Sequence, residues 1–161
     1  MKIKYLAVVL IIVLALGCVA CNNDGENSTT TESAKFYETD SLTYIIDNPV
    51  CPLQYSAQWK DIVETTVTVQ SDECIVDFVA DLDDKSIPVF SIVFCNNSDE
   101  GSLLGALKVD DGEKNVYLID LYDDEMASSL SEEALEKYQA MYEDINVIIS
   151  KLIYENGMTL G

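Results

Sequence analysis

Carboxylates are the most numerous side chains in this chain that could do chemistry, and many of them gather in three short clusters. The 161 residues include 29 acids against 9 lysines, give a formal net charge of -20, and contain neither histidine nor arginine. Calcium takes six to eight oxygen ligands, but none of the clusters has Asp-x-Asp-x-Asp-Gly spacing followed by a distant glutamate. We interpret them as acidic turns and expect no metal and no cofactor. The clusters are Asp81, Asp83 and Asp84; Asp110, Asp111 and Glu113; and Asp120, Asp123, Asp124 and Glu125.

The catalytic chemistry open to these residue types is narrow. Without histidine there is no Ser-His-Asp or Cys-His machinery, and without arginine there is no bidentate clamp for phosphate. Two carboxylates facing each other across a cleft could still perform acid–base chemistry on a glycoside, and the candidates are Glu64, Asp77 and Asp120. A sheltered cleft lined by two of them would indicate an enzyme, whereas a flat exposed apolar patch would indicate protein binding.

Three cysteines lie inside strand-like or loop segments and have no zinc-binding spacing: Cys51, Cys74 and Cys95. If the loop between Asp81 and Pro88 closes symmetrically, residues whose numbers sum to 169 lie opposite each other, which pairs Cys74 with Cys95. Opposed residues are within disulfide range, although we favour two buried thiols that resist alkylation.

Aromatic residues form another candidate site near the start of the folded part. Tyr44, Tyr55 and Trp59 could make a ligand platform. The interpretation we favour is that they close one edge of the core, because large aromatic side chains are among the main contributors to buried surface.

Strands and one long helix must position these side chains. Seven runs rich in Val, Ile, Leu, Tyr and Phe predict strands, and the acidic loops between them predict antiparallel hairpins. The hairpin at the Asp-Gly dipeptide should place Leu107 opposite Val116. The two runs on either side of the Asp81–Ser86 loop are apolar on both faces, as expected for central strands that are covered on both sides. The runs are Leu42–Ile46, Val50–Tyr55, Thr66–Gln70, Cys74–Asp81, Ile87–Cys95, Leu103–Val109 and Val116–Tyr122.

The C-terminal region predicts a long amphipathic helix that begins after the N-cap Ser131 and stops at Gly157. Its apolar residues recur at three- and four-residue spacing, which favours packing on the sheet over a coiled-coil dimer and therefore a monomer. A short N-terminal helix is expected around Ser56–Glu64. The predicted fold class is α+β: an antiparallel β-sheet covered by the long C-terminal helix and by this short helix. The apolar positions are Leu135, Tyr138, Tyr142, Ile145, Ile149 and Leu152.

The N-terminus has the features of an export signal. A short basic stretch precedes an apolar run from Tyr5 to Gly17, and Leu14-Ala15-Leu16-Gly17-Cys18 resembles the lipobox of bacterial lipoproteins. The resemblance implies removal of residues 1–17, palmitate-type acylation of Cys18, and a lipid-anchored location on the extracytoplasmic face of the cell membrane. Cys21, after Cys18-Val19-Ala20, is the alternative attachment site.

Composition divides the rest of the chain into two parts. Residues 18–35 are polar and acidic, so they predict a lipidated disordered tether, and residues 36–161 predict a single α+β domain. Loss of Lys2 and Lys4 with the signal leaves 7 lysines against 29 acids, a net charge of -22. Such a charge excludes nucleic acid and anionic lipid surfaces as partners.

Two resemblances concern the domain. The segment from Leu53 to Lys60, followed by strands and a C-terminal helix, is loosely similar to the PsbP-like α-β-α sandwich. The whole domain also resembles small uncharacterised lipoproteins of Gram-positive gut bacteria, through Ile87-Pro88-Val89-Phe90, Leu103-Leu104-Gly105 and the helix. We predict a non-enzymatic binding or accessory module whose partner is an extracytoplasmic protein or a small ligand. The alternative is an extracytoplasmic carboxylate-dependent hydrolase.

Overall fold

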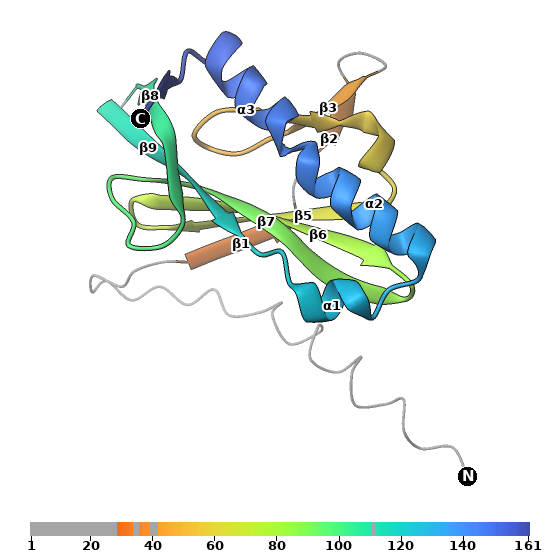
Figure 1. Cartoon of the computed structure of the whole chain (residues 1–161). Helices are drawn as coiled ribbons and strands as arrows, with labels where there is room; N and C mark the ends of the chain where they lie inside the picture. Colours follow the sequence, from red (N-terminus) through yellow and green to blue (C-terminus); the bar gives the residue numbers. More distant parts are fainter. Residues whose placement is uncertain (1–28, 34–35, 39–41, 111) are drawn as a thin grey trace, which may run out of the picture.

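Two antiparallel sheets and a pair of C-terminal helices make up the fold (Figure 1). The computed structural model describes residues 29–33, 36–38, 42–110 and 112–161. The large sheet has the strand order β1-β5-β6-β7-β9-β8-β10, and the small sheet has the order β2-β3-β4. The strands are β1 (Thr29–Ser33), β2 (Phe36–Glu38), β3 (Thr43–Ile46), β4 (Leu53–Ser56), β5 (Val63–Gln70), β6 (Glu73–Leu82), β7 (Lys85–Cys95), β8 (Ser102–Val109), β9 (Gly112–Asp120) and β10 (Thr159–Leu160). The helices are η1 (Ala57–Trp59), a 3₁₀ turn, and α1 (Asp124–Ser128), α2 (Glu132–Glu143) and α3 (Ile145–Tyr154).

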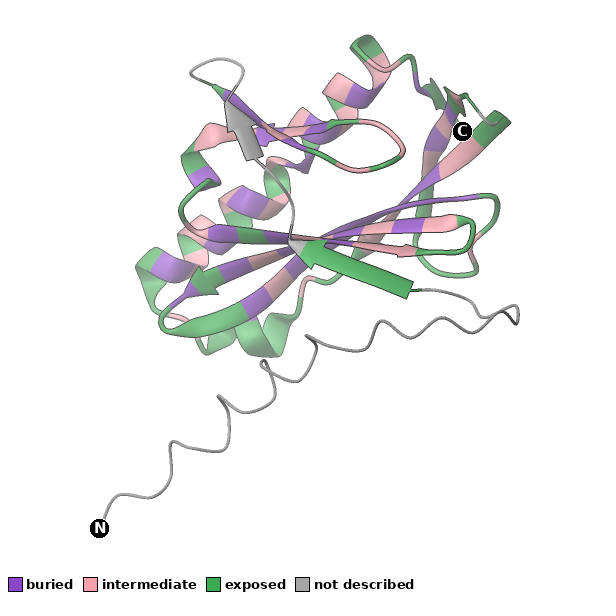
Figure 2. Cartoon of the chain, turned by 180° about the vertical axis from the view of Figure 1, so that it is seen from behind, coloured by how far each residue is buried: buried purple, intermediate pink, exposed green. Residues whose placement is uncertain are grey.

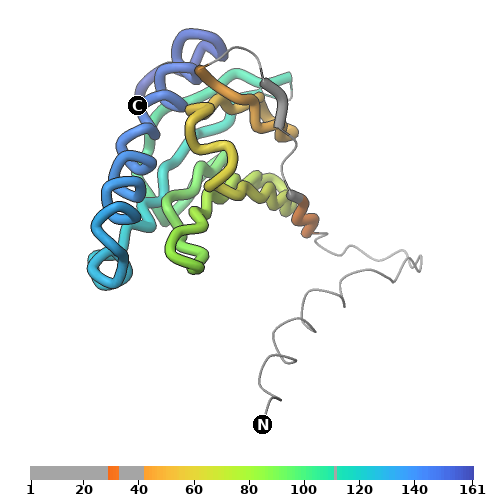
Figure 3. The backbone as a smooth tube through the Cα atoms, turned by 90° about the vertical axis from the view of Figure 1, so that its right-hand side faces the viewer, coloured from red at the N-terminus to blue at the C-terminus, as the bar shows by residue number. Residues whose placement is uncertain are grey.

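The helices and the small sheet share one face of the large sheet. α2 lies against β6 and β7, while α3 lies against β4 of the small sheet. Figures 1 and 3 show this layering, with the α2–α3 column on one side of the strands. The α+β class with an antiparallel sheet and a long C-terminal helical segment is therefore confirmed.

The core fills the space between these layers. Tyr55 stands at its centre, with its ring 5.3 Å from that of Phe78 and 5.9 Å from that of Phe90, both in edge-on contact. Its hydroxyl donates a 2.6 Å hydrogen bond to the backbone carbonyl of Met141 in α2. One aromatic side chain thus links the small sheet, the large sheet and the helix.

The C-terminal helical segment begins and ends where its capping residues predict. Ser131 accepts a hydrogen bond from the Ala134 backbone N–H, and Gly157 has a φ of +71°. The structure differs at Asp144, a turn residue that separates α2 from α3. The break lies between the part of the segment that covers β6 and β7 and the part that covers β4.

The predicted register of β6 and β7 is wrong by one residue. Cys74 lies opposite Phe94, not opposite Cys95, and the register shifts again between Phe78 and Val79. The cause is the turn: Asp83 and Asp84, with φ of +51° and +59°, form a two-residue turn centred one position before the middle of the assumed loop. The turn alone would offset the pairing from the prediction by two residues. The β-bulge near the turn removes one of the two, which leaves the one-residue error.

A one-residue slip moves every side chain to the other face of a sheet. Cys74 therefore faces the main core, whereas Cys95 belongs to a small cluster on the opposite face with Val93 and Tyr117. The predicted Cys74–Cys95 juxtaposition is wrong, although both cysteines are buried as expected, at 3% and 4% exposed. All three cysteines in the described residues are free thiols.

The β8–β9 hairpin is offset from its prediction by two residues. Leu107 lies opposite Lys114, and Val116 lies opposite Gly105. An even offset preserves the faces, so Leu107 and Val116 still share one face, and both are buried in the main core.

The predicted short helix at Ser56–Glu64 is replaced by the three-residue η1 and the start of β5. Extended structure wins here because the residues after Asp61 are β-branched and the Asp81 N–H pairs with the Ile62 carbonyl at 2.8 Å. In the described chain, the long helices lie on one face of the large sheet, so these residues give no support to an α-β-α sandwich of the PsbP-like type. The second face instead carries the small apolar cluster of Val93, Cys95 and Tyr117. Figure 2 shows buried and exposed residues alternating along several strands of the large sheet.

Part of the predicted tether is structured. Thr29–Ser33 forms β1 and pairs with Thr66–Gln70 of β5. Backbone pairing needs no large apolar side chain, and the Thr31 and Thr68 hydroxyls lie 3.0 Å apart across the two strands. The other residues of the predicted tether, 18–28 and 34–35, lie outside the described residues.

Candidate functional site

The two candidate lipid-attachment cysteines, Cys18 and Cys21, lie outside the described residues. In the part of the chain that the structure describes, no helix is long and apolar enough to cross a membrane.

The aromatic candidates belong to the core. Tyr44 and Tyr55 are fully buried and their rings meet edge-on at 6.1 Å, which confirms the core interpretation over a ligand platform. Trp59 is also buried, and its indole N–H donates a 2.7 Å hydrogen bond to Asp144, the residue that separates α2 from α3. Gln58 donates to the same carboxylate oxygen at 2.7 Å.

The three carboxylates proposed for catalysis do not converge. Asp120 lies opposite Phe90 on the helix-covered face and accepts a 2.9 Å hydrogen bond from the Tyr142 hydroxyl. Glu64 and Asp77 project from the other face of adjacent strands, since Glu64 lies opposite Val79. The pockets described below include Glu64 but neither Asp77 nor Asp120.

The acidic turns are also separate from one another. Among the described residues, no group of three or more Cys, His, Asp or Glu side chains is arranged to hold a metal ion.

Exposed large apolar side chains are spread over several elements and connections: Leu42, Leu103, Leu121, Met126, Tyr154 and Leu160.

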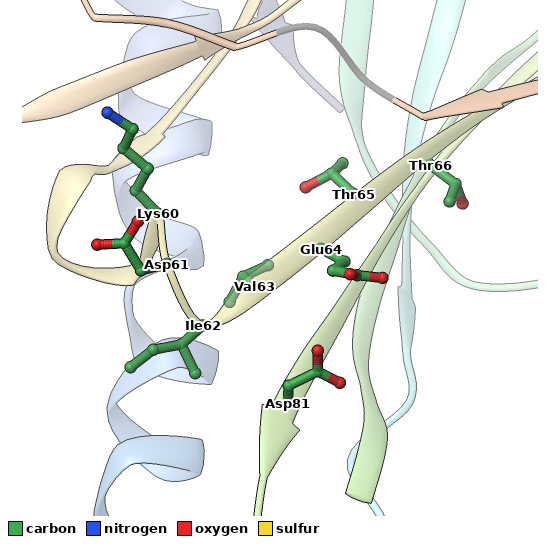
Figure 4. Close-up of a pocket in the computed structure, with 8 residues that line it drawn as sticks. All are labelled: Lys60, Asp61, Ile62, Val63, Glu64, Thr65, Thr66 and Asp81. Carbon is green, nitrogen blue, oxygen red and sulfur yellow. The ribbon is translucent and has the colours of Figure 1, made fainter. Parts of the chain in front are cut away.

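A pocket of about 300 Å³ lies where β5 begins, and Figure 4 shows its lining. Lys60 and Asp61 come from the turn after η1, and Asp81 comes from the end of β6. Glu64 and Asp81 point to the same side of the β5–β6 pair, while Lys60 points away from them (Figure 4). The lining residues are Lys60, Asp61, Ile62, Val63, Glu64, Thr65, Thr66 and Asp81.

The pocket coincides with an open stretch of sheet edge. β1 pairs with β5 only from Thr66 to Gln70. No described strand pairs with the outer edge of Val63–Thr65, although Val63 and Thr65 are themselves buried, at 4% and 3% exposed. We call Val63–Thr65 the open edge.

Carboxylates lie beside the open edge on the second face of the sheet. Asp77 and Asp81 stand two residues to either side of Val79, which is opposite Glu64, so the three acids share the second face, with Glu64 on β5 and the other two on β6. We call Glu64, Asp77 and Asp81 the carboxylate row. Hydroxyl groups orient two of them: Ser91 donates to Asp77 at 2.6 Å and Ser86 donates to Asp81 at 2.8 Å.

The other face of the open edge is anchored in the core. Thr65 is buried and faces Tyr44 of β3. Burial raises the pKa of the Tyr44 phenol well above its usual value, and a hydrogen bond with Thr65 acts in the opposite direction. On this face, the first half of β5 is therefore packed into the core.

A second pocket of about 290 Å³ adjoins the first and shares Ile62 and Asp81 with it. It lies where the β6–β7 turn meets α2. The Asp83 carboxylate accepts hydrogen bonds from the Ser131 backbone N–H at 2.7 Å and from its hydroxyl at 3.1 Å. These hydrogen bonds lower the pKa of the Asp83 carboxyl, and the bond from the Ser131 backbone N–H has the largest effect.

The sequence analysis missed the open edge because it began this strand at Thr66. The signal was present: from Val63 onward, residues alternate between the core face and the second face, with Glu64, Thr66 and Thr68 on the latter. The position at which β1 stops pairing with β5 depends on tertiary structure, and no local sequence pattern predicts it.

Comparison with protein-family models, with curated proteins and with solved structures found no match to this chain.

Proposed function

We propose that this protein is a membrane-anchored, extracytoplasmic lipoprotein that acts without catalysis, as a binding or accessory module. The lipobox-like sequence ending at Cys18 supports the anchor, and the sheet-edge pocket beside the carboxylate row supports binding. The pocket is the observation that carries the binding function. The resemblance to small lipoproteins of Gram-positive gut bacteria agrees with this proposal and stays a prediction.

The position of β1 supports an orientation for the anchored domain. Thr29 pairs with Gln70, so the chain enters the sheet at that end of β5. Ten residues separate Cys18 from Thr29, and if they form the disordered tether that their composition predicts, their root-mean-square span is roughly 17 Å. Glu64 lies six residues further along β5, about 20 Å from Gln70. The anchor thus holds the Gln70 end near the bilayer and leaves the pocket on the distal side.

The anchor is tested by detergent phase partition of the chain expressed in a lipoprotein-processing bacterium. Cys18→Ser should shift the protein out of the detergent phase or leave an unprocessed precursor, because the acyl chains supply the membrane affinity. Cys21→Ser is the matched control and should remain in the detergent phase. The reverse pattern would transfer the attachment site to Cys21, and retention of both variants would contradict lipid anchoring.

A further inference from the structure

We infer that Asn156 is a site of spontaneous deamidation, at which the backbone nitrogen of Gly157 attacks the Asn156 side-chain amide. The modified chain carries aspartate or isoaspartate at position 156 and therefore one further negative charge. This modification goes beyond the binding function proposed above, because it needs neither a partner nor an enzyme.

The sequence favours this asparagine over the others in the chain. The reaction requires the backbone nitrogen of the next residue to reach the carbonyl carbon of the asparagine side chain, and a bulky next residue hinders the approach. Glycine has no Cβ and the widest range of backbone conformations, so it hinders the approach least. Asn156-Gly157 is the single Asn-Gly dipeptide in the 161 residues.

The backbone at this position leaves the attacking nitrogen without a partner. Helix α3 ends at Tyr154, and the Met158 N–H closes the last turn by donating to the Leu152 carbonyl at 2.9 Å. In a complete Schellman cap the Gly157 N–H would also donate to a carbonyl of that turn. Among the described residues, however, the peptide unit that joins Asn156 to Gly157 makes no backbone hydrogen bond through its carbonyl or its N–H. No hydrogen bond therefore has to break before this unit turns or the nitrogen loses its proton.

The surroundings also leave room for the reaction. Gly157 is exposed, and a Cβ built on it would meet no atom within 4 Å. The Asn156 side chain is half-buried, and its amide donates to the Pro52 carbonyl at 3.3 Å, just beyond the usual range for such a bond. The amide is thus held weakly, and both the glycine nitrogen and water can reach it.

The reaction has two balanced steps. Hydroxide removes the proton from the Gly157 nitrogen, a bond forms between this nitrogen and the Asn156 Cγ, and the bond between Cγ and Nδ2 breaks, with release of ammonia after the leaving nitrogen takes a proton from water. Water then adds to one of the two carbonyl carbons of the five-membered ring and opens it. Opening at Cγ gives aspartate, whereas opening at the backbone carbonyl carbon gives isoaspartate.

The new carboxylate should weaken a contact between distant parts of the chain. A carboxylate at position 156 cannot donate to the Pro52 carbonyl, and the two acceptors repel each other. Asn156 also lines a pocket of about 390 Å³ together with Val50, Cys51 and the tip of the β8–β9 hairpin. Deamidation should therefore loosen the connection between β3 and β4 from the end of α3.

The test incubates the full chain in a non-ionic detergent at 37 °C, at pH 6 and at pH 8.5, and samples it over several weeks. Cleavage after lysine releases the peptide Leu152–Gly161. Mass spectrometry should find replacement of NH by O at Asn156, faster at pH 8.5 because hydroxide removes the glycine proton, and isoaspartyl methyltransferase should label the product. Asn115 and Asn146, which both precede valine, are controls in the same digest and should stay intact.

A synthetic peptide Leu152–Gly161 measures what the fold contributes to the rate. Because the Asn156–Gly157 peptide unit makes no backbone hydrogen bond, the folded chain should react within ten-fold of the free peptide. Asn156→Gln should react at least ten-fold more slowly, because its ring would have six members. Asn156→Asp reproduces one product and should lower Tm and speed hydrogen exchange at Val50 and Cys51.

Three results would overturn the inference. They are an intact Asn156 in the folded chain after the free peptide has reacted completely, an equal rate at Asn115, and a rate that is the same at both pH values. An Asn156→Asp variant with unchanged Tm and unchanged hydrogen exchange would contradict the structural consequence.

Discussion

At the scale of single residues, Asp144 connects the aromatic core to the helices. Its carboxylate accepts hydrogen bonds from the Trp59 indole and the Gln58 amide, and it occupies the turn between α2 and α3. Local propensity alone would have continued the helix, since its apolar stripe runs through this position without interruption. A tertiary contact with η1 thus coincides with the position where α2 ends and α3 begins.

Replacing this carboxylate should affect both stability and a spectroscopic signal. Asp144→Ala should lower the free energy of unfolding by about 2 kcal/mol, because the indole N–H loses a charged acceptor. Trp59 is the single tryptophan in the chain, so its emission should shift to longer wavelength in the folded variant. Urea unfolding followed by fluorescence measures both effects. Glu136→Ala, at an exposed position, should change neither, and an Asp144→Ala variant as stable as the parent would show that the contact contributes little.

The buried cysteines give a second prediction at this scale. Burial raises the pKa of the Cys74 thiol to about 12, with a smaller contribution from Glu73, and burial is also the main cause of the raised pKa of Cys95. Iodoacetamide at pH 8 should therefore leave both unmodified in the folded protein and label both in urea. Peptide mapping without reductant should find no Cys74–Cys95 disulfide, because the two side chains lie on opposite faces. A recovered Cys74–Cys95 disulfide would contradict the observed register.

At the scale of elements, the β6–β7 turn is joined by hydrogen bonds to the junction between α1 and α2. Asp83 reaches Ser131 at the start of α2, and the Lys85 ammonium donates to the Ser129 carbonyl at 2.9 Å. The left-handed conformation of Asp83 and Asp84 makes the turn tight enough to aim these side chains at the α1–α2 junction. The hairpin therefore positions the N-terminus of the helix that covers it.

The hydrogen bonds of Asp83 should make the free energy of unfolding depend on pH in the acidic range. Asp83 has a pKa below its usual value of 3.8, so its contribution is complete above pH 3.8 and is lost as the pH falls through the lower folded-state value. Asp83→Asn, which tolerates the same backbone conformation, should lower Tm at pH 5, and the difference from the parent should shrink toward pH 2.5. Thermal melts monitored by circular dichroism measure this. Asp84→Asn is the control, and a constant Tm difference for Asp83→Asn would argue against a role for its charge.

At the scale of the whole molecule, helices and the small sheet cover one face of the large sheet, and the second face is divided. One part carries the small apolar cluster around Val93, and the other carries the carboxylate row next to the open edge. The entry of the chain at Gln70 and the pocket at the start of β5 lie at opposite ends of that strand. This polarity suits a domain held from one end and approached from the other.

The charge of the molecule should keep it off anionic membranes unless lipid holds it there. A version beginning at Asn22 carries 7 lysines against 29 acids, so it should not sediment with phosphatidylserine-containing vesicles at physiological salt. The chain processed with its lipid should sediment with them, because acyl insertion outweighs the repulsion. Sedimentation of the lipid-free version would contradict the expected repulsion.

The sequence by itself determined the strand character of the central runs, the C-terminal helical segment with its caps, and the burial of Tyr44, Tyr55 and both strand cysteines. These follow from local physics, since periodicity, capping residues and side-chain size act within a few residues. The chain also carried its charge and its lipobox-like signal in plain view, independent of any fold.

Only the tertiary structure decided the registers, the break at Asp144 and the site. The register of β6 and β7 depends on which two residues form the turn and on a bulge near Val89, and a change of one residue moved Cys95 to the other face. Among the described residues, β1 pairs only with the Thr66–Gln70 part of β5. This pairing joins segments more than thirty residues apart, so its energy depends on packing that no short sequence window contains.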